Sequence, residues 1–267
     1  YDNIGSGTYV TNLTQHPRFP LDPSAESQRT LFEGETDRAD AYGAAMRGYL
    51  IPPTNGTYTF WIASDDASEL LLSSSTNPAA ASRIAYVSGY TSPRAWTANT
   101  SQRSTNCTLA AGHAYYMEAR VKEGGGGDHI AVAWKGPATG NRTNVVSGLY
   151  LAPYSMNYMP HPSGHTNAVR RNMLAGAKVC RITVSDVNAG DTSTLAITAG
   201  NGSGLFLLDP DGWIRVSNDA ALLGASTPVT LSIRATDNGV PPLSGTSSVR
   251  LNLTATNVIG VAEPQRE

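Results

Sequence analysis

The sequence predicts an all-β protein built from two β-sandwich domains in tandem, the second of them immunoglobulin-like. Three observations support this fold class. Apolar and polar residues alternate over short runs, which is the period of a strand with one buried face. The 267 residues include 26 glycines and 16 prolines, which favour turns over long helices. No stretch has a sustained helical period, apart from a weak one over residues 37–46.

The first domain is predicted from six short strands. Residues 1–30 are irregular, because three prolines between positions 17 and 23 favour an extended chain. Asn55 and Gly56 form a tight-turn pair that leads into an apolar strand. The expected strands cover residues 45–51, 57–62, 68–72, 83–87, 114–121 and 129–134. Short antiparallel strands at this spacing form a sandwich or a barrel.

A second set of strands follows a break in the pattern. Pro, Asn, His and Met accumulate between residues 153 and 176 without alternation. Strands are then expected at 178–184, 194–198, 204–208, 212–216, 228–235 and 248–254, which is the strand count and size of an immunoglobulin-like sandwich. The predicted organisation is a first domain over 1–152, a structured linker over 153–176, a second domain over 177–258 and a tail over 259–267.

Composition narrows the classes of function. The formal net charge is −2 and charged residues make up 15% of the chain, so neither a nucleic-acid footprint nor an electrostatic membrane anchor is indicated. No apolar run approaches the roughly 20 residues that span a bilayer. Cys107 and Cys180 are far apart, and two buried free thiols are the preferred interpretation, with a disulfide as the alternative.

Seven Asn-x-Ser/Thr triplets favour an extracellular location. They are a mild excess over chance for the N-glycosylation acceptor pattern. The alternative is a Thr- and Asn-rich bacterial surface protein, in which such triplets carry no meaning; both readings place the chain outside the cell. The candidate acceptors are Asn12, Asn55, Asn99, Asn106, Asn141, Asn201 and Asn252.

The pair Asp65–Asp66 is the most prominent candidate for a site, because it ends an apolar strand. Neighbouring carboxylates repel each other unless a cation lies between them. Successive strand residues point to opposite faces, so both acids can meet one ion only if the backbone between them is unusual. A solvated turn is the alternative for the pair, and a flexible loop is the alternative for the four-glycine tract at 124–127.

Four stretches of the first domain resemble the protective-antigen lectin-like domain family over about residues 5–152. They are 42–53 (YGAAMRGYLIPP), 55–73 (NGTYTFWIASDDASELLLS), 112–119 (GHAYYMEA) and 122–134 (KEGGGGDHIAVAW). The resemblance implies a β-sandwich found in adhesins, flocculins, glycosidases and toxins. In its sugar-binding members, two consecutive aspartates joined by a cis peptide bind calcium. A later loop adds backbone oxygens, and the ion takes two hydroxyls of a sugar.

The residues fit a calcium site on chemical grounds. A hard cation takes six to eight oxygen ligands, and glycines let a loop turn its carbonyls inward. The expected metal ligands are Asp65, Asp66, Gly125, Gly126, Gly127 and Asp128, with Ca²⁺ as the cofactor. Sugar contacts are expected from Asp65, Asp66 and His129. For His129, the alternative is a surface histidine without a ligand role. Trp61 and Trp134 are predicted to be core residues.

The second domain resembles a cadherin repeat over about residues 160–258. The resemblance rests on 184–191 (VSDVNAGD), 204–216 (GLFLLDPDGWIRV) and 234–244 (RATDNGVPPLS), and it implies calcium ions that rigidify a junction. By motif, Asp186, Asn188 and Asp237 correspond to ligands, with oxygens from the linker around Asn167. A plain β-turn is the alternative for Asp237. The Leu-Asp-Arg-Glu motif is absent, and the exit motif is reduced to residues 256–258.

No enzyme signature is present. A nucleophile elbow, a phosphate loop and zinc-ligand spacing are all missing from the sequence. We therefore predict an extracellular, calcium-dependent carbohydrate-binding module for adhesion, carried on a cadherin-like spacer of a larger surface protein. Its expected partners are cell-surface glycans and neighbouring copies or domains. The alternative is a structural assembly unit of an extracellular fibre or receptor, in which calcium only stiffens loops.

Overall fold

The computed structural model describes residues 1–188, 190–226 and 228–255. Its contacts divide the chain into two units, Tyr1–Met156 and Asn157–Glu267. Both units consist of β-sheets with short helices between strands, so the predicted all-β class is confirmed. Within the described ranges, no helix is long and apolar enough to cross a membrane.

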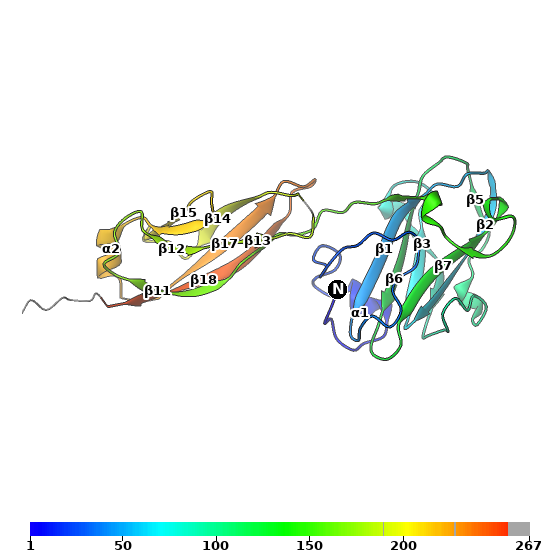
Figure 1. Ribbon diagram of the computed structural model, residues 1–267, viewed down its shortest axis with the longest axis horizontal. Helices are drawn as coiled ribbons and strands as arrows, with labels where there is room; N and C mark the ends of the chain where they lie inside the picture. The colour runs from blue at the N-terminus through cyan, green and yellow to red at the C-terminus, as the bar shows by residue number, and fades with distance from the viewer. Residues whose placement is uncertain (189, 227, 256–267) are drawn as a thin grey trace, which may run out of the picture. The chain divides into compact units, whose positions relative to one another are not determined.

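The first unit is a sandwich of two antiparallel sheets (Figure 1). One sheet has the strand order β4, β3, β6, β1, β9 and the other β5, β2, β7, β8. The strands are β1 Gly43–Leu50, β2 Gly56–Asp65, β3 Ser68–Leu72, β4 Ser82–Val87, β5 Cys107–Leu109, β6 Tyr115–Lys122, β7 His129–Lys135, β8 Asn144–Val145 and β9 Leu151–Pro153. All six predicted strands are present, while β5, β8 and β9 are additional.

The helices of this unit are short. Helix α1 is Val10–Thr14, and 3-10 turns occur at Pro78–Ala80, Thr100–Gln102, Pro137–Thr139 and Gly148–Tyr150. The weak helical period over residues 37–46 does not form a helix. Residues 37–42 form a loop that leads into β1, and residues 43–46 are the first part of that strand.

The core of the first unit lies between the two sheets. Leu70 and Met117 reach it from one sheet, and Phe60 from the other, all with 0% exposure. Trp134 stacks on Tyr58 with ring centroids 5.0 Å apart. Trp61 and Trp134 are 8% and 1% exposed, which confirms both as core residues. Burying each large apolar side chain contributes about 1.5–3 kcal/mol, so these contacts stabilise the pairing of β2 with β7.

The second unit is also a sandwich. Its sheets have the orders β11, β18, β17, β14 and β12, β16, β15, with a separate pair β10, β13. The elements are β10 His161–Pro162, β11 His165–Arg170, β12 Lys178–Arg181, β13 Val184–Ser185, β14 Ser193–Ala199, β15 Phe206–Leu208, β16 Trp213–Val216, α2 Asp219–Gly224, β17 Val229–Asp237 and β18 Ser244–Thr254. Each of the six predicted strands has a counterpart here.

The segment expected as a linker contains strands of the second unit. The two units divide between Met156 and Asn157, and β11 pairs in parallel with β18. Residues 256–258 and the expected tail at 259–267 lie outside the described residues. Cys107 and Cys180 are both free thiols; Cys180 is buried, and Cys107 is half-buried.

Candidate metal and sugar site

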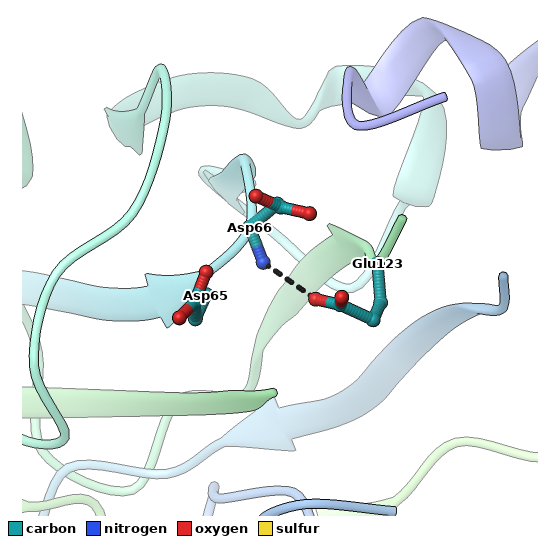
Figure 2. Close-up of side chains that lie close together, drawn as sticks. All are labelled: Asp65, Asp66 and Glu123. Atoms are coloured by element: carbon teal, nitrogen blue, oxygen red, sulfur yellow. Dashed lines mark hydrogen bonds between the residues drawn. The ribbon is translucent and has the colours of Figure 1, made fainter. Parts of the chain in front are cut away.

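Three carboxylates meet at the end of β2. The Asp65–Asp66 peptide bond is cis, as the resemblance implies. Asp65 is the last residue of β2, and Glu123 follows β6 directly. One oxygen from each of these three side chains lies within 4.8 Å of the other two (Figure 2). The strand end therefore gathers three anionic oxygen donors in a space that one cation can fill.

Glu123 is the ligand candidate that the sequence prediction missed. Its side chain is fully buried, and Oε2 accepts a hydrogen bond of 3.0 Å from the Asp66 backbone N–H. Its Oε1 is buried and has no hydrogen-bond partner. The sequence feature that could have identified Glu123 is its position directly before Gly124. If the glycine tract folds against Asp65 and Asp66, the residue before the tract comes close to them as well.

The three carboxylates of Asp65, Asp66 and Glu123 repel one another, and a bound cation would relieve this repulsion. Burial raises the pKa of the Glu123 carboxyl to about 7, and the charges of Asp66 and Asp65 add to the rise. Burial also raises the pKa of Asp65, with Asp66 as the next cause. None of the three carboxylates forms an ion pair with a described Lys or Arg side chain. The nearby Lys122 ammonium instead donates to the carbonyls of Gly5 and Glu123, at 2.7 and 2.5 Å.

The glycine tract folds against the carboxylates. The Gly124 N–H donates to Asp66 Oδ2 at 3.0 Å, and a Cβ on Gly124 would lie 2.7 Å from the Ser6 carbonyl oxygen. Gly126 has a φ of +112°, which favours glycine. A Cβ on Gly127 would lie 4.0 Å from Asp65 Oδ2. The tract is thus fitted to the site, although the metal contacts expected from its carbonyls remain a prediction.

Asp128 has a different setting from the three acids. Its Oδ1 accepts a hydrogen bond from the Tyr42 hydroxyl at 2.8 Å, and Oδ2 accepts one from the Ala39 N–H at 3.0 Å. Its side chain therefore holds the loop before β1 and lies outside the group of three carboxylates. A metal contact from Asp128 stays a prediction, and the structure gives the side chain a structural task.

His129 lies opposite Asp65 in the β2–β7 ladder and is 6% exposed, so the alternative of a surface histidine is wrong. Burial lowers the pKa of its imidazole, and the Asp65 charge opposes that shift. Its Nε2 is buried without a hydrogen-bond partner. On β7, the ring lies beside Asp65, while its contact with sugar stays a prediction.

The second predicted ligand set gathers in the second unit, with Asn157 added. Asn157 Nδ2 donates to Asp237 Oδ1 at 3.0 Å, and the Asn188 N–H donates to Asp186 Oδ1 at 2.9 Å. Asn188 Oδ1 accepts from the Tyr158 N–H at 2.7 Å. Three oxygens here are buried without a hydrogen-bond partner: Asn157 Oδ1, Asp186 Oδ2 and Asp237 Oδ2. Such orphaned acceptors fit a cation.

Two expectations about this second set are refined. Asp237 also forms the turn, because Oδ1 accepts from the Gly239 and Leu243 N–H groups at 3.0 Å each, so turn and ligand roles coexist in one carboxylate. Asn167 is not beside the set: it lies in β11, with its side chain on the Cys180 thiol. Asn157 Oδ1 is the buried oxygen from the segment entering this unit that lies beside the set, and its role as a ligand is a prediction.

The glycosylation candidates differ in their exposure. Asn201 and Asn252 are half-buried, and Asn201 Nδ2 donates to the Phe206 carbonyl at 2.6 Å. The other five side chains, at Asn12, Asn55, Asn99, Asn106 and Asn141, are exposed. Their modification stays a prediction, and the structure favours these five as acceptors.

Comparison with known proteins found one matching family model and several similar proteins. Residues 27–148, all within the first unit, match the family model of the PA14 domain. The chain is 31% identical over 154 residues to N-acetyl-beta-glucosaminyl-glycoprotein 4-beta-N-acetylgalactosaminyltransferase 1 of Mus musculus, covering 56% of this chain and 15% of that protein. It is 32% identical over 93 residues to Protocadherin Fat 2 of Mus musculus, covering 34% and 2%.

Among solved structures, the third cadherin domain from human protocadherin 7 shares 19% identity with a TM-score of 0.33, covering 41% of this chain and 98% of that one. The epithelial adhesin 6 A domain from Candida glabrata, in complex with Galβ1-3GlcNAc, shares 16% identity with a TM-score of 0.34, covering 44% and 52%. The chain spans 15% or less of the length of the curated relatives named above.

Proposed function

We propose that the chain is an extracellular, calcium-dependent carbohydrate-binding module for adhesion, carried on a cadherin-like unit of a larger surface protein. The observation that carries the proposal is the group formed by Asp65, Asp66 and Glu123, three carboxylates within 4.8 Å and without a described cationic partner. The PA14 match over residues 27–148 supports the carbohydrate-binding class. Similarity to a protocadherin supports the extracellular setting.

The donor set suits Ca²⁺, which binds carboxylate and carbonyl oxygens in flexible geometry. Asp65, Asp66 and Glu123 would hold the ion, and Glu123 Oε1 is the orphaned oxygen that a cation satisfies. A bound calcium with fewer than its full ligand number can take two neighbouring hydroxyls of a sugar.

A binding role also accounts for the match to the transferase, because the chain covers only 15% of that protein. Calcium would keep all three acids ionised, which suits coordination and is unfavourable for general acid catalysis. We therefore propose binding without catalysis.

The structural alternative has an observation of its own in the second unit. The buried orphaned oxygens of Asn157, Asp186 and Asp237 fit a second calcium ion, which would tie the segment entering this unit to the end of β17. That ion would stiffen the second unit whether or not the first unit binds sugar. The two functions are therefore compatible, and they are tested separately.

The decisive experiment is binding of the whole chain to a glycan array in millimolar calcium, repeated with chelator and with Asp65→Asn. Chelator-sensitive binding that Asp65→Asn abolishes is the expected result. Calorimetry that detects calcium at the first site, together with no binding to any glycan, would leave the structural role alone standing. Binding that survives chelator would contradict the metal-dependent mechanism.

A further inference from the structure

Exposed aromatic side chains are rare in this molecule. The chain has 12 tyrosines, four tryptophans and four phenylalanines. Only Tyr9, Tyr86 and Tyr90 are exposed, at 65%, 39% and 72%, and every aromatic residue falls within the described ranges. Large aromatic rings normally contribute to stability by burial, so rings left in solvent beside a candidate site can contribute to binding instead.

Tyr90 is anchored beside Asp65. Its neighbour Thr91 is buried, and the Thr91 N–H donates to the Ser64 carbonyl at 2.8 Å. The Ser64 N–H in turn donates to Thr91 Oγ1 at 3.2 Å. Since Ser64 directly precedes Asp65, the Cα atoms of Tyr90 and Asp65 lie within roughly 13 Å of each other by chain geometry. The backbone next to Tyr90 is thus held against the end of β2, and the Tyr90 side chain is exposed to solvent.

Tyr9 is anchored on the Asp66 side. Its neighbour Thr8 packs against Gly124, with Cγ2 2.8 Å from the position of a Cβ there. Gly124 itself donates to Asp66 Oδ2 at 3.0 Å. The Lys122 ammonium holds the same N-terminal loop through the Gly5 carbonyl, at 2.7 Å. A second solvent-exposed tyrosine therefore belongs to a loop that contacts the glycine tract beside Asp66.

Tyr86 provides a contrast. It lies on β4, and the Arg83 guanidinium covers its ring at 4.6 Å from the centroid. Its ladder partner is Glu69 of β3, and its neighbour Val87 pairs with Ser68. Its ring already has a cationic partner, whereas no ring or cation contact involves Tyr9 or Tyr90 in the described structure.

We propose that Tyr9 and Tyr90 are the aromatic contacts that select the saccharide held at Asp65, Asp66 and Glu123. A pyranose has an edge of hydroxyls and an apolar face of C–H groups. The metal takes the hydroxyls, and a tyrosine ring takes the C–H face through its apolar body. The inference rests on the proposed function, and it names the ligand class as sugars that present an open C–H face beside the metal-bound diol.

The test compares Tyr9→Ala, Tyr90→Ala and Tyr90→Phe with Tyr86→Ala as the matched exposed control. Calcium affinity is measured by calorimetry, and sugar binding by titrating immobilised galactose-, mannose-, glucose- and N-acetylgalactosamine-terminated mono- and disaccharides. We expect Tyr9→Ala and Tyr90→Ala to bind the preferred sugar roughly 3- to 10-fold more weakly, with calcium affinity unchanged. Tyr90→Phe and Tyr86→Ala should match the wild type, since the ring is retained in the first and is already covered by Arg83 in the second.

The outcomes separate the two proposals. Sugar binding by the wild type that is equal in Tyr9→Ala and Tyr90→Ala would overturn the inference and leave the proposed function standing. Wild-type protein that binds calcium and none of the immobilised sugars would overturn the proposed function and the inference together. Because both substituted side chains are exposed, folding is expected to be intact, and thermal unfolding of each variant in chelator checks this.

Discussion

Neutralising Glu123 should have opposite effects on the metal-free and the calcium-bound protein. The pKa of its carboxyl is about 7, against 4.5 for an ordinary glutamate. Each pKa unit corresponds to 1.36 kcal/mol, so ionised Glu123 costs the folded, metal-free protein about 3 kcal/mol above pH 7. Glu123→Gln removes that charge and keeps an acceptor for the Asp66 N–H. We expect the variant to be about 2 kcal/mol more stable than wild type in chelator at pH 8.

The dependence on pH follows from the direction of this pKa shift. The folded state holds the Glu123 proton more tightly than the unfolded state does. Wild-type stability in chelator should therefore fall as pH rises from about 4.5 to about 7 and change little beyond, as far as this group is concerned. The Gln variant lacks this component, so the two proteins should have similar stabilities at pH 4.

Calcium should reverse the order of stability. The variant loses one of three anionic ligands, and ligand charge sets calcium affinity, so we expect its affinity to fall at least roughly tenfold. Urea unfolding followed by tryptophan fluorescence reports mainly on the first unit, which contains Trp61, Trp96 and Trp134. Calorimetry gives the calcium affinity, and Glu26→Gln, at an exposed glutamate, is the control. Unchanged calcium affinity in Glu123→Gln would refute its role as a ligand.

Three further substitutions test the rest of the structure. Asp128→Asn should destabilise the protein by about 1–2 kcal/mol in urea unfolding, because the carboxylate accepts hydrogen bonds from the Tyr42 hydroxyl and the Ala39 N–H. Its calcium affinity should change less than that of Glu123→Gln. An equal loss of affinity in the two variants would make Asp128 a ligand. Asp237→Asn should abolish the calcium-induced protection of the second unit against proteolysis, whereas Asp209→Asn, at a carboxylate paired with Arg215 in the same unit, should retain it. Glu118→Gln should reduce the free energy of unfolding by about 3 kcal/mol at pH 7, because Glu118 is 3% exposed and pairs with Arg47 and Arg120 at 2.9 Å each. Arg120 and Arg47 lower the pKa of Glu118 against the opposing effect of burial, so this contribution should be lost as the pH falls through that pKa. A difference from wild type that does not change with pH would contradict the reasoning.

Local patterns were sufficient to predict most of the fold. Alternation placed β2 and β7, and the Asn55–Gly56 pair marked the turn before β2, because these signals are encoded within a few residues. The short β5, β8 and β9 escaped prediction, since two or three residues are too few to show a period. The extent of the linker was also misjudged: β11 is held by pairing with β18, about 80 residues away in the sequence, which no local pattern records.

The candidate sites divide in the same way. Asp65, Asp66, Asp186 and Asp237 were predicted as ligands from motifs along the chain, and this assignment stays a prediction. Glu123 and Asn157 were missed because their roles depend on which segments the sheets bring together. Their buried oxygens are identified only when hydrogen-bond partners are counted in three dimensions.

The parallel pairing of β11 with β18 has a mechanical consequence for the second unit. His165 pairs with Val249 and Arg170 with Thr254, so the first and last long strands of this unit run in the same direction. Tension applied between the start of β11 and the end of β18 would load their hydrogen bonds in shear, so that several would have to break together instead of one after another. Under load, such a unit would resist extension until a threshold force and would transmit smaller forces nearly undiminished.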